Sequence, residues 1–446
     1  MSLGVVILAA GQGVRMRSAL PKVLHPLGGR PMLSYAVEAA RALSDLPPLL
    51  VVGYGAEAVR QQAGADLLYA VQAEQRGTGH AVLQARPLLE AQATEILVLY
   101  GDMPLLTVET LRRVVEARRE GEATLALLTL VADDPRGFGR VIRDQQGAVL
   151  RIVEEADASQ AERAVRELNA GVYAFDASWL WEHLPLLPLQ RKGEYYLTDL
   201  VEMALAEGRR VVAVTTDDPQ EALGINTRVH LAEAEAALRR RINRRWMEAG
   251  VTLVDPERTY IEADVSIGAD TVIWPNTYLR GRTTIGSGCQ IGPNSLIEDS
   301  TIGDGVRVLA SVVEQAVMEA GSDVGPFSHL RRGAHVGTGA HVGNFGEVKN
   351  STLGPGAKMG HFSYLGDAEV GAGANIGAGT ITCNYDGQQK HRTVIGEGAF
   401  IGSDTMLVAP VQVGAGARTG AGSVVTRDIP DGALAYGVPA RVRQDE

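Results

Sequence analysis

Up to about residue 226, short apolar runs alternate with longer segments of helical periodicity. Strand-like runs cover residues 5–8, 49–52, 96–100 and 124–131. Helical patterns lie between them, for example over residues 32–43 and 108–119. This alternation predicts βαβ units around a mostly parallel sheet, with ligands bound at the carboxyl ends of its strands.

Residues 228–249 are rich in Ala, Glu, Leu and Arg and contain neither Gly nor Pro. Such a composition predicts one long helix. Its cluster of five arginines between Arg239 and Arg245 is most simply a solvated face of a connecting helix; binding to nucleic acid is the alternative.

Beyond residue 250 the helical period gives way to an apolar residue at every sixth position. Of the 52 glycines in the chain, 32 lie in this last part. The repeat positions are Ile261, Ile267, Ile273, Leu279, Ile285, Ile291 and Ile297; then Val324, Leu330, Val336, Val342 and Val348; then Ile395, Ile401, Leu407 and Val413. Hexads of this kind are typical of a parallel β-helix, in which stacked coils bury a core that no single coil could bury.

The spacing also predicts how one coil stacks. A coil of three hexads has 18 residues, but the step from Val348 to Leu353 is one residue short. The coil that carries His361 should therefore stack on residues 17 earlier, with Asn344 beneath His361 and Glu347 beneath Tyr364.

Charge and cysteine content narrow the function classes. The net charge of -11 argues against nonspecific binding to DNA or RNA, which needs cationic surface. Cys289 and Cys383 cannot form a disulfide framework and suit a reducing interior. No apolar run approaches the length of a membrane span, so we expect a cytoplasmic protein.

The stretch "LAAGQGVRMRSALPKVL" places a glycine turn after the first strand, followed by Arg15, Arg17 and Lys22. It fits neither the dinucleotide fingerprint nor the Walker loop. Its exposed backbone N–H groups and cations suit a phosphate-rich ligand. A solvated glycine turn is the alternative.

Several motifs together resemble one family of bacterial enzymes. "LAAGQGVRMRSALPKVLHPLGGRPML", "QAEQRGTGHA", "LYGDMPLL", "LNAGVYAF", "GEYYLTD" and "GIN" resemble its uridylyltransferase half, and "AHVGNFGEVKNS", "GHFSYLGDAEVGAGANIGAGTITCNYDG" and "IGSDTMLVAPV" its acetyltransferase half. The family is that of the bifunctional N-acetylglucosamine-1-phosphate uridylyltransferases and glucosamine-1-phosphate N-acetyltransferases. The resemblance implies an α/β protein in which a Rossmann-like nucleotidyltransferase domain (1–227) is joined by a linker helix (228–249) to a left-handed parallel β-helix (250–446).

For the first half, the resemblance implies a nucleotide and sugar phosphate site that uses UTP. Arg15 and Lys22 would contact the phosphates. Mg²⁺ would be held by Asp102 and Asn226, whose oxygen ligands suit this ion. Gln72, Gly77 and Thr78 would contact the uracil, and Gly139, Glu154 and Asn169 the sugar. Further nucleotide or sugar contacts are expected from Leu8, Ala10, Gly11 and Tyr100. The segment "GEYYLTD" resembles a loop beside the sugar; tyrosines that serve only packing are the alternative. Ala170 stands where relatives commonly carry a hydroxyl residue, which would remove one hydrogen bond near the sugar.

For the second half, the resemblance implies acetyl transfer from acetyl-CoA to the amine of a sugar phosphate. An ammonium must lose a proton before it attacks, and His361 occupies the family's base position. A histidine that is merely part of the coil surface is the alternative. Phosphosugar contacts are expected from Arg331, Lys349, Tyr364, Asn375, Asn384 and Tyr385, and acetyl-CoA contacts from Ala378, Ser403, Ala421 and Lys390.

Two departures from the family concern this second site. His329 and Arg332 stand where relatives often carry Arg and Pro, so the grip of Arg331 on a phosphate can differ. The C-terminal "LAYGVPARVRQDE" lacks an arginine that some relatives place on the coenzyme, and Arg441 or Arg443 could replace it.

The resemblance also implies a homotrimer that acts on small molecules, without a nucleic-acid or membrane partner. Two other functions stay open at the level of sequence. One is a sugar nucleotidyltransferase whose β-helix serves only assembly or regulation, and the other is a noncatalytic trimeric scaffold that binds nucleotide sugars.

Overall fold

The computed structural model describes residues 2–190 and 193–443. The chain divides into two compact units, residues 1–238 and residues 239–446. We describe each unit by itself.

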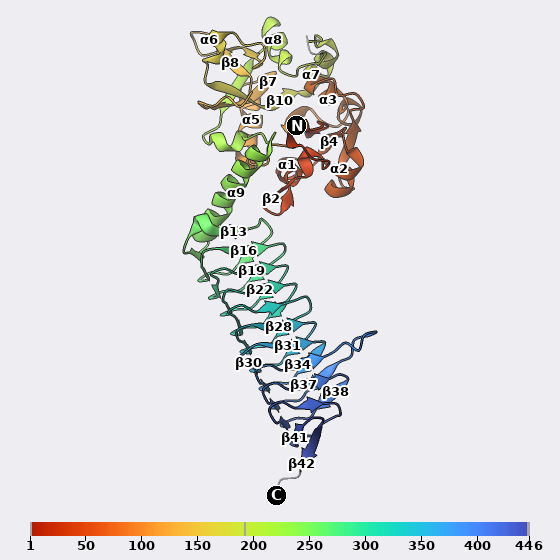
Figure 1. The fold of residues 1–446 in the computed structure, drawn as a ribbon. Helices are drawn as coiled ribbons and strands as arrows, with labels where there is room; N and C mark the ends of the chain where they lie inside the picture. Colours follow the sequence, from red (N-terminus) through yellow and green to blue (C-terminus); the bar gives the residue numbers. More distant parts are fainter. Residues whose placement is uncertain (1, 191–192, 444–446) are drawn as a thin grey trace. The chain divides into compact units, whose positions relative to one another are not determined.

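The first unit is built on one twisted sheet flanked by helices (Figure 1). Its seven main strands follow the order β11-β7-β10-β6-β1-β4-β5, and β8 and β9 extend it beside β10. The strands are β1 (Leu3–Ala9), β4 (Leu49–Val52), β5 (Leu68–Val71), β6 (Glu95–Tyr100), β7 (Leu125–Val131), β8 (Arg140–Arg143), β9 (Val149–Val153), β10 (Glu167–Asp176) and β11 (Val211–Thr215), and β2 (Pro26–Leu27) pairs with β3 (Arg30–Pro31) in a separate ribbon. The helices are α1 (Met32–Leu43), α2 (Ala56–Ala63), α3 (Thr78–Leu83), α4 (Arg86–Leu89), α5 (Val108–Glu120), α6 (Gln160–Arg163), α7 (Ala177–His183) and α8 (Asp199–Ala206).

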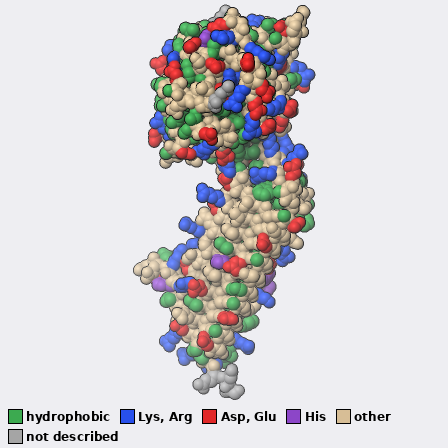
Figure 2. All heavy atoms as spheres, turned by 180° about the vertical axis from the view of Figure 1, so that it is seen from behind, with side chains coloured by type: hydrophobic (Ala, Val, Ile, Leu, Met, Phe, Trp, Pro, Cys, Tyr) green, Lys and Arg blue, Asp and Glu red, His purple; other side chains and the backbone are tan. Residues whose placement is uncertain are grey.

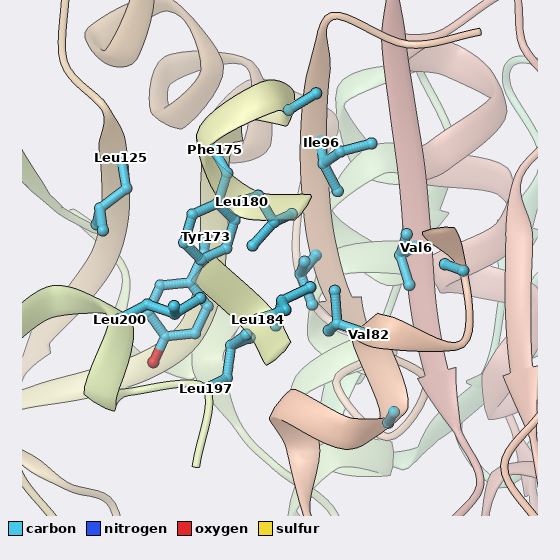
Figure 3. Packing of buried hydrophobic residues seen from close by; sticks show 14 of the residues in the cluster. Val6, Val82, Ile96, Leu125, Tyr173, Phe175, Leu180, Leu184, Leu197 and Leu200 are labelled. Atoms are coloured by element: carbon cyan, nitrogen blue, oxygen red, sulfur yellow. The ribbon is translucent and has the colours of Figure 1, made fainter. Parts of the chain in front are cut away.

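The predicted strands and helices of this unit are confirmed, and the sheet is mostly parallel as expected. β1 pairs in parallel with β4 and β6, and β7 with β11. Among the seven main strands, the long central strand β10 runs antiparallel between β6 and β7, and the added strands β8 and β9 also pair antiparallel. Tyr173 and Phe175 of β10 are buried, and Figure 3 shows them among Leu125 of β7 and leucines of the covering helices. β10 thus joins the two parallel parts of the sheet through a shared apolar core.

The second unit is a parallel β-helix with three faces (Figure 1). The first face comprises β12 (Thr252–Leu253), β15 (Val272–Ile273), β18 (Gln290–Ile291), β21 (Arg307–Val308), β24 (Asp323–Val324), β27 (His341–Val342), β30 (Lys358–Met359), β33 (Asn375–Ile376), β36 (Phe400–Ile401), β39 (Arg418–Thr419), β41 (Leu434–Gly437) and β42 (Ala440–Arg443). The second face comprises β13 (Thr259–Ile261), β16 (Thr277–Arg280), β19 (Leu296–Glu298), β22 (Val312–Glu314), β25 (His329–Leu330), β28 (Gly346–Lys349), β31 (Ser363–Gly366), β34 (Ile381–Cys383), β37 (Met406–Val408) and β40 (Val424–Val425). The third face comprises β14 (Ser266–Ile267), β17 (Thr284–Ile285), β20 (Thr301–Ile302), β23 (Val317–Met318), β26 (His335–Val336), β29 (Thr352–Leu353), β32 (Ala368–Val370), β35 (Thr393–Ile395) and β38 (Val411–Val413).

The hexad prediction is confirmed residue by residue. Each predicted repeat position is buried, and none is more than 8% exposed. Buried hydroxyl groups near the corners bond to carbonyl groups of the neighbouring coil, as when Thr271 Oγ1 donates to Gly286 O at 2.8 Å. Each coil therefore completes the apolar core of the next coil and provides hydrogen bonds to carbonyl groups near its corners.

The predicted 17-residue stacking is also confirmed. Glu347 pairs with Tyr364, Val342 with Met359 and Gly346 with Ser363. Because the offset is 17 on both sides of the corner, Asn344 and His361 occupy equivalent positions on successive coils.

One long helix, α9 (Arg228–Glu248), runs across the boundary between the units, as its composition predicts. Within the first unit, Glu235 of this helix accepts a hydrogen bond from Gly28 N at 2.9 Å. Within the second unit, Asn243 Nδ2 donates to Pro256 O at 2.7 Å and to Thr259 O at 3.0 Å. Each end of the helix is thus bound to the unit that contains it.

The β-helix core makes a stability prediction. Ile291 is fully buried between Ile273 and Val308 of the adjoining coils. We expect Ile291→Ala to lower the free energy of unfolding by about 2–5 kcal/mol, because a cavity is left in a stacked core. The matched control Gln290→Ala removes an exposed side chain on the same strand and should change it by less than about 0.5 kcal/mol. Urea unfolding of the full chain, followed by circular dichroism, measures both; equal losses would contradict this account of the core.

Candidate functional sites

A cleft of about 760 Å³ opens in the first unit where β1 and β6 end. This volume is typical of a site for one small organic ligand. Thirteen of the residues predicted for nucleotide, sugar and metal line it: Leu8, Ala10, Gly11, Lys22, Gln72, Gly77, Thr78, Tyr100, Asp102, Gly139, Glu154, Asn169 and Asn226. Arg15 is not among the described residues that line the cleft; it is exposed on the short helix Val14–Met16.

Lys22 connects the two predicted metal ligands. Its ammonium is hydrogen-bonded to Asp102 Oδ2 and lies 3.2 Å from Asn226 Oδ1. The side chains of Lys22 and Asp102 are each 14% exposed, so this ion pair is only partly screened by water. The backbone supports the same arrangement, since Ile225 N donates to Asp102 O at 2.9 Å. The two oxygen donors therefore converge on one point at the edge of the sheet.

The opening loop packs closely on Lys22. Gly13 has a φ of 64°, and a Cβ atom there would lie 2.6 Å from the Cβ of Lys22. Gly55 has a φ of 66°, and a Cβ atom there would lie 2.5 Å from Pro21 Cγ. Both positions need glycine for their backbone conformation and for space. Together they hold the backbone of residues 21–22 in place.

The segment of residues 72–79, expected to contact the uracil, and the loop "GEYYLTD", expected beside the sugar, are joined by hydrogen bonds. Leu197 N donates to Thr78 Oγ1 at 3.0 Å, and Gly79 N donates to Tyr195 O at 2.9 Å. On the base side, Gln72 Nε2 donates to Gly77 O at 3.0 Å. The two segments are far apart in sequence but form one wall of the cleft.

The residues expected to hold the sugar lie beside β8 and β9 and on β10. Asn169 N donates to Gly139 O at 2.9 Å, and Asn169 Nδ2 donates to Tyr173 Oη at 2.6 Å. Glu154 accepts a hydrogen bond from Thr198 Oγ1 at 3.1 Å. Ala170 is buried beside Asn169 and supplies no hydroxyl group.

Tyr100 stands at the end of β6 and also lines the cleft. Burial raises the pKa of its phenol, and the nearby carboxylates of Glu154 and Asp102 raise it further. Tyr100 therefore stays neutral at physiological pH and keeps its O–H as a hydrogen-bond donor.

The cleft is also lined by residues that were not predicted, among them Gln75, Glu155 and Thr198. Gln75 Nε2 donates to Ala10 O at 2.7 Å and so fixes the end of β1. Glu155 pairs with the buried guanidinium of Arg140. Gln75 and Thr198 lie inside motifs that had been singled out, "QAEQRGTGHA" and "GEYYLTD", so position in a motif was an available signal.

In the second unit, His361 is exposed at the corner between the first and second faces. The register of the neighbouring strands places Ala378, Ser403 and Ala421 at the same corner on the following coils. Asp404 N donates to Ala378 O at 2.6 Å and Gly422 N to Ser403 O at 2.8 Å. The predicted base and the predicted acetyl-CoA contacts thus form one column along a single edge of the prism.

Several predicted phosphosugar contacts share the second face. Arg331 Nη1 donates to Glu347 Oε1 at 2.7 Å, and Glu347 pairs in register with Tyr364. His329, which replaces an arginine of many relatives, lies 2.9 Å from Glu314 through its Nε2 atom. Glu314 was not predicted as part of this area, and Glu347 was predicted only as the residue beneath Tyr364.

Two lysines predicted for different ligands come together at this face. The neighbouring ammonium of Lys390 lowers the pKa of Lys349, and Arg331 contributes in the same direction. Lys390 belongs to a loop, residues 384–392, that leaves the prism between β34 and β35 (Figure 1). The loop is closed by His391 N donating to Asn384 O at 2.8 Å. It therefore delivers a second cation beside Lys349.

Other predicted residues lie in this region in different settings. Asn384 Nδ2 donates to Asp367 Oδ2 at 2.5 Å, and Tyr385 is 60% exposed on the loop. Asn375 is on the first face, where it pairs with Lys358 and Phe400, and not on the second face with Tyr364. Arg443 lies on β42 and stacks over the ring of Tyr436, at 5.1 Å from its centroid.

Within residues 2–190 and 193–443, no three His, Cys, Asp or Glu side chains are grouped closely enough to hold a metal ion. A metal in the first cleft would thus depend on few protein ligands. No helix in the described ranges is both long and apolar enough to span a bilayer.

Comparison with known proteins gives matches to both units. Residues 5–170 match the MobA-like NTP transferase domain, and residues 264–299 and 392–427 match the bacterial transferase hexapeptide family of six repeats. The chain is 54% identical over 440 residues to the bifunctional protein GlmU of Stutzerimonas stutzeri, covering 98% of this chain and 96% of that protein. It is 50% identical over 431 residues to the GlmU of Heliobacterium modesticaldum, covering 96% and 94%.

A third relative, the GlmU of Pelobacter propionicus, is 48% identical over 448 residues, which cover all of this chain and 97% of that protein. These similarities span both units and the helix that joins them. The chain therefore belongs to the GlmU family of bifunctional proteins.

Proposed function

We propose that the chain catalyses two steps in the synthesis of UDP-N-acetylglucosamine. The second unit would acetylate glucosamine 1-phosphate with acetyl-CoA, and the first would transfer a uridylyl group from UTP to the product, with release of pyrophosphate. The observation that carries this proposal is the cleft in which Lys22, Asp102 and Asn226 converge. Bringing two polyanions together for phosphoryl transfer depends mainly on positioning and on neutralised charge, and this cleft offers both.

Magnesium fits the first site. Asp102 and Asn226 offer one carboxylate and one amide oxygen, both within hydrogen-bond distance of a single cation, Lys22. Mg²⁺ prefers such hard oxygen ligands and takes its remaining ligands from water and substrate phosphates. When bound, it would neutralise charge on the phosphates. Lys22 would contact the phosphates, while Tyr100, Glu154 and Asn169 would orient the sugar.

For the second site, we propose that His361 accepts the proton of the sugar amine as the amine nitrogen attacks the acetyl carbon of acetyl-CoA. The C–S bond of the thioester then breaks, and coenzyme A leaves as its thiol. His361 is exposed, so a substrate can reach it, and it stands at the head of the column Ala378, Ser403 and Ala421. Arg331, Lys349 and Lys390 supply a cationic area for a sugar phosphate. The mutual repulsion of the two lysines would be relieved by an anion bound between them.

The substrates are small molecules, and we place the enzyme in the cytoplasm. Both cysteines are free, which suits a reducing compartment. On the face of the first unit seen in Figure 2, cationic and anionic side chains are interspersed. This mixture gives no basic stripe for nucleic acid on that face, which supports a small-molecule function.

We further propose that three chains assemble through the second face of the prism. Its outward positions carry two groups of partly exposed apolar side chains, separated in the register by His329, Glu347 and Tyr364. The first group is Tyr278, Leu296 and Val312, and the second is Ile381, Met406 and Val424. Corresponding outward positions on the third face are mostly polar, as at Thr284 and Thr301, with Val317 and Val394 as apolar exceptions. Burial of the apolar face against other copies would remove this surface from water.

The two activities should separate by mutation. His361→Ala should lower the rate of acetyl transfer by about 10²–10⁴-fold, because it removes the base, and leave pyrophosphate release intact. Asp102→Asn should do the reverse, with a loss of about 100-fold or more in pyrophosphate release. Free thiol is followed with glucosamine 1-phosphate and acetyl-CoA, and pyrophosphate is followed in a separate assay with UTP and N-acetylglucosamine 1-phosphate. Loss of both activities in either variant, or no thiol release by the unaltered protein, would refute the proposal of two independent sites.

Arg140 should act as a positioning residue for Gly139 and Glu154, which are expected to hold the sugar. It is 1% exposed, donates to Phe138 O and pairs with Glu155, so its contacts flank Gly139 and Glu154. Arg140→Met should raise KM for the sugar phosphate about tenfold, the effect of one lost charged hydrogen bond, with little change in KM for UTP.

Arg143→Met, on the same strand and paired with Glu167, is the matched control for Arg140. It should leave both KM values unchanged. An equal rise in KM for UTP and for the sugar phosphate in Arg140→Met would indicate a general structural role instead.

Assembly can be tested on the proposed interface. Val312→Lys should shift the protein from trimer to monomer in light scattering, because a charge is buried against an apolar face. Acetyl transfer should fall with the trimer while pyrophosphate release persists. Thr301→Lys places the same charge on the third face and should leave the trimer intact. A Val312→Lys protein that remains trimeric would rule out this face as the interface.

A further inference from the structure

We infer that Lys22 is a stand-in cation: it occupies the metal-binding oxygens of Asp102 and Asn226 until a nucleotide draws it away. The inference rests on the proposed function, since it concerns the order in which metal and nucleotide enter that site. It assigns to Lys22 a role before the reaction, in addition to contact with phosphate.

The contacts carry the first step of the argument. The Lys22 ammonium bonds to Asp102 Oδ2 and also lies 3.2 Å from Asn226 Oδ1. These are the same two oxygens that would bind Mg²⁺. An ammonium and a divalent ion cannot both occupy the point where these oxygens converge, because like charges repel strongly in a partly buried site. A metal ion that enters alone must therefore displace Lys22 from its carboxylate.

The second step is that the oxygens stay together without Lys22. Ile225 N donates to Asp102 O at 2.9 Å, which ties the backbone before Asn226 to the end of β6. The ligand pair is thus organised by the backbone and not only by the ammonium. Removing the lysine side chain should expose a preformed pair of donors.

The third step is that Lys22 can leave only by moving its side chain. Gly13 packs against its Cβ and Gly55 against Pro21, so the backbone at this position is held. The flexible four-carbon stem of lysine nevertheless allows the ammonium to turn within the cleft that Lys22 lines. Nucleotide phosphates would offer it another anionic partner.

Metal and nucleotide should therefore bind cooperatively. A nucleotide that binds the ammonium frees the two oxygens for the metal, and a bound metal releases the ammonium for phosphate. Such coupling is reciprocal by thermodynamic necessity. Free metal should bind the protein weakly when nucleotide is absent.

The test measures Mn²⁺ binding to the full chain without nucleotide, by electron paramagnetic resonance. Lys22→Met should bind Mn²⁺ about tenfold more tightly than the unaltered protein, the factor expected when one hydrogen bond to a charged group no longer has to be broken. Lys22→Arg keeps a cation and should remain weak. Arg17→Met removes an exposed charge from the same loop and should change nothing, and Lys22→Met with Asp102→Asn should lose the gain.

Thermal melting identifies any variant that fails to fold, and Lys22→Gln then replaces Lys22→Met. Unchanged or weaker Mn²⁺ binding in folded Lys22→Met or Lys22→Gln would overturn the inference. So would an equal gain in Arg17→Met, which would indicate a general effect of charge. Pyrophosphate release by the unaltered protein tests the proposed function separately, so that the two can fail independently.

Discussion

Parallel pairing of neighbouring strands is the constraint on which both units depend. In the first unit, it brings the ends of β1 and β6 to one edge, where Lys22 meets Asp102 from 80 residues away in sequence. In the second unit, it stacks the coils in register, so that residues one coil apart in sequence form a column along the prism. His361 lies in line with Ala378 for this reason, and no side-chain contact between them is needed.

In each candidate site, one cation is paired with a carboxylate of the chain. Lys22 is held by Asp102, and Arg331 by Glu347. Such pairs keep a charged side chain in place at modest net energy, because an ion pair near the surface trades hydration for attraction. An anionic ligand can then replace the carboxylate at little cost. Lys349 differs, since its neighbour Lys390 is also a cation and lowers its pKa.

Much of this architecture could be predicted from the sequence, because periodicity reports burial directly. Every hexad position from Ile261 to Val413 that was predicted is buried, and the shortened step after Val348 correctly predicted that Glu347 lies under Tyr364. The direction of a strand could not be predicted in this way. β10 has the same apolar pattern as a parallel strand, and its reversal is set by its pairing with β6 and β7.

Among the residues of the candidate sites, too, some could be predicted from the sequence and others could not. Asp102, which directly follows a predicted strand, could be expected at the edge of the sheet, whereas Gly77 was predicted to contact the ligand only through the family resemblance. Partners chosen by tertiary packing could not be predicted, because no local pattern indicates that Arg140 pairs with Glu155.

The loop of residues 384–392 shows how the prism accepts an irregular segment without losing its register. Across this loop the pairing offset rises from 17, as for Thr352 with Glu369, to 25, as for Glu369 with Val394. The strands on both sides stay paired, because the extra residues leave at a corner, where no ladder hydrogen bond is interrupted. A coil can therefore carry a projecting loop while its core residue Ile395 remains buried. The same fold that fixes Lys349 on a rigid strand thus brings Lys390 to it from a separate loop.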